Sequence, residues 1–156
     1  MKVNIGLQEK HLARISAKLN TLLADEAVLY IKTRNFHWNV KGPTFIMLHN
    51  FFEGQYEELA ETMDSVAERI RNLGHTATGS MAGFIKGARI KEAADGGKAD
   101  AMLKALLEDH EAVVRHLRND INDINDTYKD AGTADFLTGI MELHEKMAWM
   151  LRSHLE

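Results

Sequence analysis

The feature that most constrains this chain is the stretch from Pro43 to Gly74, whose apolar residues follow the three-and-four spacing of an amphipathic helix. The apolar positions are Phe45, Leu48, Phe52, Leu59, Met63, Val66, Ala67 and Ile70. At 1.5 Å per residue, about thirty helical residues make a rod of about 45 Å. The stretch therefore predicts one long helix with a single apolar face.

Two pairs of polar side chains interrupt the pattern of this stretch. His49 with Glu53 and Asp64 with Glu68 are each spaced i, i+4, so the members of a pair are neighbours on the helix surface. At about 100° per residue, the four side chains fall within an arc of about 100°. His49 alone is typical of a half-buried interface histidine. Together with three carboxylates on one arc it indicates a metal site, and mixed nitrogen and oxygen ligands suit labile Fe(II) better than structural Zn.

The two pairs cannot bind one ion within a straight helix. His49 and Asp64 are separated by about 22 Å of helix, whereas metal–ligand bonds measure roughly 2.0–2.3 Å. Either Gly54 breaks the rod, or the pairs meet across two antiparallel copies centred near Gln55–Leu59. We favour the second arrangement, because one Gly costs about 1 kcal/mol and need not kink a helix. A two-fold interface then creates two identical sites.

Three further stretches have a helical period, at about residues 7–36, 99–128 and 133–155. Gly42-Pro43 ends the first, which places His37 and Trp38 on its last turn or just beyond, and Thr133 is the expected N-cap of the last. Residues 75–98 form a Gly-rich connection with a short apolar piece, Met81–Ile85. Such a crossover lets the third long helix run parallel to the second.

The expected fold is therefore all-α: a single domain over residues 1–156, built as a ferritin-like four-helix bundle with one long crossover that carries a short helix. None of the eight His residues follows a Glu by three positions. Because Glu-x-x-His pairs hold the usual di-iron site inside such bundles, we expect that internal site to be absent.

Composition narrows the class of protein further. The 156 residues include no Cys, which excludes disulfides and thiolate metal sites. No signal-peptide or membrane-spanning apolar run occurs, which predicts a cytosolic protein. A net charge of −4 argues against a generic nucleic-acid binder.

Four motifs give the chain its likeness to a known family: NFHWNVKGP, LHNFFE, MDSVAERI and the closing HEKMAWMLRSHLE. Over nearly its whole length the chain resembles Dps, the DNA-binding proteins from starved cells, which are mini-ferritins. The resemblance implies a bacterial cytoplasmic protein, in some members associated with the nucleoid, that forms a hollow homo-oligomeric shell of about twelve subunits. Such shells act as ferroxidases: they oxidise ferrous iron, characteristically with hydrogen peroxide, and store ferric mineral.

The resemblance also implies which residues bind iron. The metal ligands and catalytic residues would be His37, His49, Glu53, Asp64 and Glu68, with Asp64 and Glu68 on a different subunit from the others. Many members carry an acid directly after the second His, where this chain has Asn50. Trp38 is either a packed aromatic at a helix end or an indole that absorbs a stray oxidising equivalent beside the iron.

Other functions stay open at this point. The alternative from another class is a DNA-compacting stress protein in which iron storage is secondary, and a surface or immune ligand is a third. DNA-binding members use Lys/Arg-rich terminal extensions, but this chain has one Lys in its first nine residues and ends in Leu155-Glu156. We therefore expect no DNA binding and no membrane partner.

Several further residues have two interpretations each. Asp123, Asp126 and Asp130, with Asp120 and Asp135 nearby, form either a solvated helix end or an acidic pore that attracts Fe²⁺. Trp149 belongs either to the core or to an interface. The remaining candidates, which are His110, His116, His144 and His154, are expected to be structural or surface residues.

Overall fold

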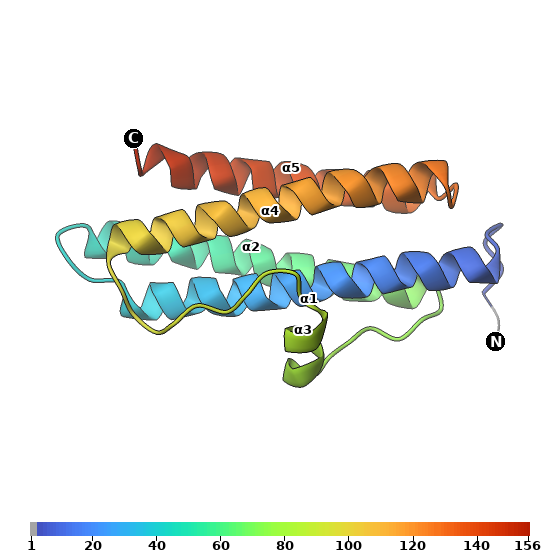
Figure 1. Cartoon of the computed structure of the whole chain (residues 1–156), viewed down its shortest axis with the longest axis horizontal. Coiled ribbons are helices and arrows are strands. Elements are labelled where there is room, and N and C mark those ends of the chain that lie inside the picture. Colours follow the sequence, from blue (N-terminus) through green and yellow to red (C-terminus); the bar gives the residue numbers. More distant parts are fainter. Residues whose placement is uncertain (1–2) are drawn as a thin grey trace.

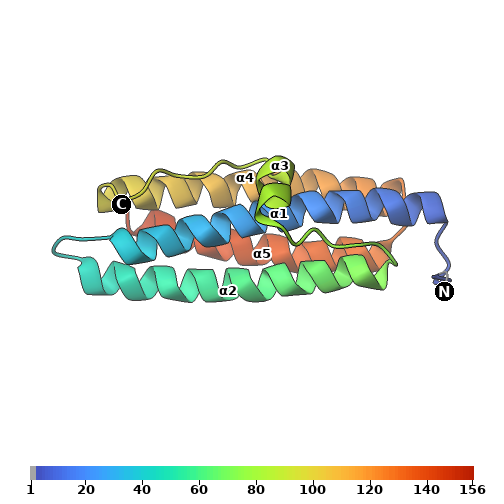
Figure 2. The ribbon, with the colours of Figure 1, turned by 90° about the horizontal axis from the view of Figure 1, so that it is seen from below.

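The computed structural model describes residues 3–156 and contains five helices, four long and one short. They are α1 (Glu9–Asn39), α2 (Phe45–Asn72), α3 (Met81–Gly87), α4 (Ala99–Asp126) and α5 (Ala131–Ser153). No strand occurs within the described range. The long helices form the bundle, and α3 lies outside it against α1 (Figures 1 and 2). The predicted all-α bundle with a short helix in its crossover is confirmed. Lys2, the only cation of the N-terminal arm, lies outside the described residues.

The helix directions agree with the predicted connectivity. In Figure 1, α1 runs against α2, and α4 runs against α5. The connection over residues 73–98 returns along the bundle to the end where α2 begins, so α4 runs parallel to α2 (Figure 1). The two antiparallel pairs, α1 with α2 and α4 with α5, therefore pack as two layers.

The helix ends differ from the prediction by a few residues. Helix α1 continues to Asn39, which places His37 and Trp38 in its last turn. The prediction of Thr133 as the N-cap of the last helix was wrong. Asp130 is the N-cap, and its carboxylate accepts a hydrogen bond from the Thr133 backbone N–H at 3.0 Å. A carboxylate at this position satisfies a donor that has no partner within the helix.

Two adjoining clusters of buried side chains make up the core. One gathers Leu12, Ile15, Leu19, Val66, Ile70, Val113, Leu117 and Leu137, and the other gathers Leu29, Phe36, Phe52, Leu59, Met102, Leu106, Met147 and Leu151. Each cluster draws on all four long helices. The buried stripe of α2 consists of Leu48, Phe52, Gln55, Leu59, Thr62, Val66 and Ile70. Most of the predicted apolar face of α2 is therefore the face that packs into the bundle.

Helix α2 ends in a motif that turns the chain into the crossover. The His75 N–H donates to the Ile70 carbonyl at 3.2 Å, and the Gly74 N–H donates to the Arg71 carbonyl at 2.9 Å. These two bonds define a Schellman motif, which needs a left-handed residue at its end. Gly74 supplies it with a φ of +86°.

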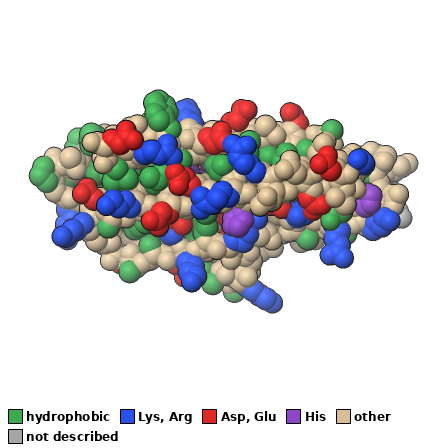
Figure 3. Space-filling view, turned by 45° about the horizontal axis from the view of Figure 1, so that its top comes forward, with side chains coloured by type: hydrophobic (Ala, Val, Ile, Leu, Met, Phe, Trp, Pro, Cys, Tyr) green, Lys and Arg blue, Asp and Glu red, His purple; other side chains and the backbone are tan. Residues whose placement is uncertain are grey.

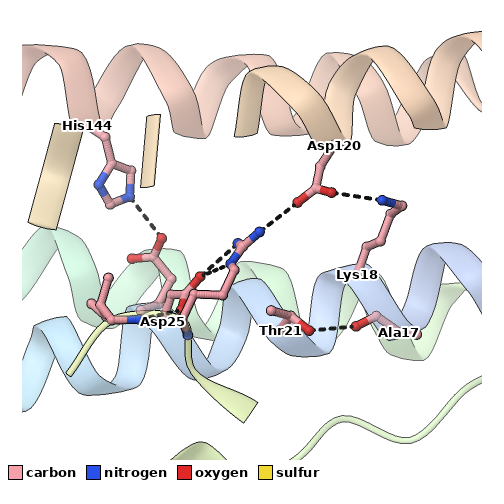
Figure 4. A network of polar contacts seen from close by, with 9 residues as sticks. Ala17, Lys18, Thr21, Asp25, Asp120 and His144 are labelled. Carbon is pink, nitrogen blue, oxygen red and sulfur yellow. Dashed lines mark hydrogen bonds and ion pairs between the residues drawn. The ribbon is translucent and has the colours of Figure 1, made fainter. Parts of the chain in front are cut away.

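The crossover is fastened to the bundle by a chain of charged groups. The Asp25 carboxylate, which is fully buried on α1, accepts hydrogen bonds from the Arg89 backbone N–H and from its guanidinium. The same guanidinium contacts Asp120 of α4 at 3.2 Å, and Lys18 contacts Asp120 at 2.9 Å (Figure 4). These contacts hold the segment after α3 against α1 and α4.

Within residues 3–156, no helix combines the length and apolar character needed to cross a lipid bilayer.

Candidate metal centre

The turn between α1 and α2 brings two of the predicted ligands into contact. Gly42, with a φ of +116°, allows a tight connection that only glycine adopts readily. His37, in the last turn of α1, and His49, near the start of α2, then stack with ring centroids 3.7 Å apart and planes at 21°. Their positions are fixed by the chain connection itself, so this half of the site forms within one chain.

Reciprocal hydrogen bonds set the tautomer of both rings. The Nδ1–H of His37 donates to the His49 carbonyl at 2.8 Å, and the Nδ1–H of His49 donates to the His37 carbonyl at 2.9 Å. A peptide carbonyl only accepts hydrogen bonds, so the hydrogen must sit on each Nδ1. A hydrogen on Nδ1 leaves Nε2 as the nitrogen whose lone pair can bind a metal.

Glu53 lies one turn after His49 and is held by a tyrosine. The Tyr56 hydroxyl donates to Glu53 Oε1 at 3.1 Å, and the Tyr56 ring meets His37 edge-on with centroids 5.2 Å apart. Desolvation, followed by the hydrogen bond to Glu53, raises the pKa of Tyr56 above its ordinary value. The phenol therefore stays protonated and remains a donor to the carboxylate.

The other two predicted ligands lie apart from this group. Asp64 and Glu68 are exposed on α2, which runs without interruption through Gly54. No set of three or more His, Asp or Glu side chains within residues 3–156 is arranged to hold a metal ion in a single chain. The structure thus brings together His37 and His49, places Glu53 nearby, and leaves Asp64 and Glu68 outside the group.

The direction of the ligand arc follows from helix geometry. At about 100° per residue, the centre of the arc from His49 to Glu68 lies about 150° around α2 from the centre of its buried stripe. The arc therefore turns away from the core of its own bundle. Phe45, which was predicted on the apolar face, is 40% exposed because it lies at the end of the bundle, where its ring packs against His49 at 5.2 Å.

The acidic residues near the turn between α4 and α5 are mostly engaged within the chain. Asp120 and Asp123 both pair with Lys18, at 2.9 and 3.0 Å. Asp130 is buried as the cap of α5 and lies 3.6 Å from Arg69. Asp126 is exposed at the end of α4. Within one chain, Asp120, Asp123 and Asp130 therefore have cationic partners, and Asp126 is exposed.

The two tryptophans are exposed to the same extent, 61% each. Trp149 is therefore not a core residue, and the core interpretation was wrong because its position on α5 faces away from the other helices. Trp38 lies beside Arg34, whose guanidinium carbon is 5.2 Å from the Trp38 ring centroid.

The bundle interior holds a polar chain that the sequence reasoning missed. Glu26 Oε1 contacts His144 Nε2 at 2.8 Å (Figure 4). His144 Nδ1 in turn contacts His110 Nδ1 at 2.9 Å. All three side chains are fully buried. Burial, with a smaller contribution from His144, lowers the pKa of His110 well below its ordinary value. The partners are up to 118 positions apart in the chain, so no local spacing signals the contact.

Comparison with known proteins gives consistent matches over most of the chain. A model of the ferritin-like domain matches residues 16–156. The chain is 46% identical to an uncharacterized low temperature-induced protein of Nostoc, covering 99% of this chain and 87% of that protein. It is 41% identical to DNA protection during starvation protein 2 of Bacillus anthracis, covering 88% and 93% of the two chains.

A solved structure extends the likeness to three dimensions. The chain superimposes on the Dps protein of Vibrio cholerae with a TM-score of 0.93 and 31% identity, over 100% of this chain and 98% of that one. That protein is described as a member of a broad superfamily of ferritin-like diiron-carboxylate proteins.

Proposed function

The chain belongs to the Dps family of ferritin-like proteins, and from this premise we propose that it stores iron and protects against oxidative damage as a ferroxidase. In this proposal it takes up ferrous iron in the cytoplasm and oxidises it at sites shared between two subunits. The ferric product is kept inside a shell of about twelve chains. Iron is the substrate and cargo of the protein, and hydrogen peroxide is the proposed oxidant.

The observation that carries the proposal is the reciprocal hydrogen bonding of His37 and His49. These bonds use the Nδ1 atom of each ring and leave both Nε2 lone pairs free of the backbone. Fixing Nδ1–H on a carbonyl is the common way to orient a metal-binding imidazole. With Glu53 beside them, the two rings offer Fe(II) nitrogen and oxygen ligands from one chain, with room for ligands from elsewhere.

The remaining ligands are proposed to come from a second subunit. The midpoint between Glu58 and Leu59 is equally far along α2 from His49 and Glu68, and from Glu53 and Asp64. An antiparallel two-fold pair of α2 helices centred there sets each half-site against the complementary half of the partner. The ligand arc turned away from the core supports this arrangement, because only another molecule can complete it.

An apolar surface next to the site supports the same pairing. A groove of about 540 Å³ is lined mainly by α1, α3 and the crossover, with Met63 of α2. Large apolar side chains around it are exposed, namely Ile31, Trp38, Met81 and Ile85. Apolar groups gathered in this way on one face are typical of a surface that another subunit covers.

In the proposed reaction these residues bind the metal and stabilise charge. The imidazoles and carboxylates bind ferrous ions and stabilise the ferric charge that develops, which is an electrostatic role. Two ferrous ions supply the two electrons that reduce one hydrogen peroxide molecule, with two protons, to two water molecules. Because both electrons come from iron, the overall reaction releases no hydroxyl radical.

The test is anaerobic addition of Fe(II) to the assembled protein, followed by hydrogen peroxide, with the absorbance of ferric mineral as the readout. We expect soluble mineral to form in a large particle. Asp64→Asn should abolish rapid oxidation, because it removes a ligand from every site. Glu142→Gln, which removes an exposed carboxylate from α5, is the control and should behave as wild type. Equal rates in both variants would reject the proposed site.

A further inference from the structure

One contact beside the proposed site is made by a residue that is not itself a predicted ligand. The Tyr56 hydroxyl donates to Glu53 Oε1 at 3.1 Å. Oε1 thus has a hydrogen-bond donor on one side, while the contact leaves Oε2 unengaged by Tyr56. A carboxylate held in this way is oriented by one oxygen and presents the other.

The Tyr56 ring is itself fixed from several sides. The Arg34 guanidinium carbon lies 4.6 Å from its centroid, and the rings of His37 and Tyr30 meet it edge-on at 5.2 and 6.1 Å. Arg34 is tethered in turn, since its Nη1 donates to the Tyr30 hydroxyl at 2.6 Å. The phenol therefore reaches Glu53 from a packed ring with few alternative rotamers.

We infer that Tyr56 is a positioning residue for the metal centre: its hydroxyl holds Glu53 in the orientation in which one carboxylate oxygen binds the metal. This inference rests on the proposed function, because it assigns Glu53 as a ligand. The physical reason is preorganisation. A glutamate side chain loses rotamer freedom when it binds an ion, and a partner that orders it beforehand removes part of that cost.

The test measures binding of Co²⁺, which is redox-inert here and accepts nitrogen and oxygen ligands, to the assembled apo-protein by calorimetry. Tyr56→Phe removes the hydroxyl and keeps the ring that packs on Arg34 and His37. We expect it to weaken the Asp64-dependent Co²⁺ affinity about tenfold, the lower end of the effect of losing an outer-shell partner. Tyr128→Phe removes a phenol at the far end of the bundle, beside His11, and should leave the affinity unchanged.

A double-mutant cycle separates positioning from general packing. If Tyr56 acts through Glu53, adding Tyr56→Phe to Glu53→Ala should cause no further loss of affinity. An equal loss in both backgrounds would assign Tyr56 a purely structural role and overturn the inference. So would wild-type affinity in Tyr56→Phe. If wild-type Co²⁺ binding did not depend on Asp64 at all, the proposed metal centre itself would be wrong, which is a separate outcome.

Discussion

At the scale of single residues, backbone carbonyls rather than carboxylates orient the two site histidines. His37 and His49 lie only twelve positions apart, on either side of one turn, and each ring uses the other residue's carbonyl. No carboxylate is needed to orient the two rings, so Glu53 stays available as a ligand. It also makes the histidine half of the site a local structure that forms with the α1–α2 hairpin.

The lowered pKa of His110 predicts how the stability of the protein depends on pH. Its folded-state pKa is lowered by burial, so below pH 6.5 the unfolded chain binds a proton that the folded chain refuses. The contribution of His110 to the free energy of unfolding should therefore stay constant above about pH 6.5. At lower pH it should decrease, by at most about 1.4 kcal/mol per pH unit. Urea unfolding of wild type and His110→Gln between pH 7.5 and 5 checks this.

The comparison between the two proteins isolates the contribution of His110. His144, which contacts the His110 ring, and Glu26, which contacts His144, remain in both proteins, so their contributions to the unfolding free energy cancel to first order. The difference in unfolding free energy between wild type and His110→Gln should narrow as the pH falls. A difference that stays constant over this range would contradict the assignment of a neutral, buried His110.

Residues close in the chain could be predicted from the sequence, and residues far apart could not. The i, i+4 spacing of His49 with Glu53 already placed both on one face of α2. The Tyr56 contact with Glu53 also follows a helical spacing and could have been found the same way. His37 was assigned only by resemblance, because its contact with His49 depends on the turn geometry. The Glu26–His144 contact depends on how whole helices dock, which no local period encodes.

At the scale of the helices, the N-terminus of α5 depends on one side chain. Asp130 caps the helix through the Thr133 N–H, accepts a hydrogen bond from the Thr133 hydroxyl, and lies 3.6 Å from Arg69. Asp130→Ala removes the cap and leaves two buried donors, the Thr133 N–H and the Thr133 hydroxyl, without this acceptor. We expect a loss of about 2 kcal/mol in unfolding free energy, the upper end for a cap, measured by urea unfolding.

A carboxylate elsewhere on the same turn is the control for this prediction. Asp126 ends α4 and is exposed, where a negative charge gains nothing from the helix dipole. Asp126→Ala should therefore change the unfolding free energy by less than about 0.5 kcal/mol. Similar losses in the two variants would show that the acidic character of the turn, rather than the cap, is what stabilises it.

At the scale of the whole molecule, the apolar groove on the α1–α3 face predicts how the protein assembles. Ile85 of α3 lines the groove and is 50% exposed. Ile85→Glu should leave the subunit folded but reduce the particle to smaller species, because it buries a charge in the proposed interface. Light scattering with circular dichroism measures both. Lys86→Glu, next to it but outside the groove lining, should assemble as wild type, and an intact shell in Ile85→Glu would exclude this face as the interface.

The charge distribution predicts weak binding to DNA. On the face that Figure 3 shows, Lys and Arg side chains are interspersed with Asp and Glu, and the chain carries a net charge of −4. Few counterions can be released from DNA phosphates by such a surface. Gel retardation of duplex DNA should therefore be absent or vanish near physiological salt. Tight binding at that salt would favour the DNA-compacting alternative instead.

We predict that each site takes its ligands from two chains, so that iron oxidation requires assembly. His49→Ala and Asp64→Ala should each abolish ferroxidation when expressed alone, since each removes a ligand from every site. In a two-fold pair of one chain of each kind, one site loses both ligands. The other takes its His49 from the Asp64→Ala chain and its Asp64 from the His49→Ala chain, so it is complete. Randomly mixed shells should then regain about a quarter of the wild-type rate.

The chain offers a matched control for this complementation. His49→Ala mixed with Glu53→Ala should recover nothing, because both changes fall in the same half-site and every site in the mixture lacks one of its ligands. Mass measurement confirms that the shells contain both variants. Recovery in the first mixture but not in the second can arise only if His49 and Asp64 of one site belong to different chains. No recovery in either mixture would place the two ligand pairs within one chain, and a bent α2 would then have to unite them.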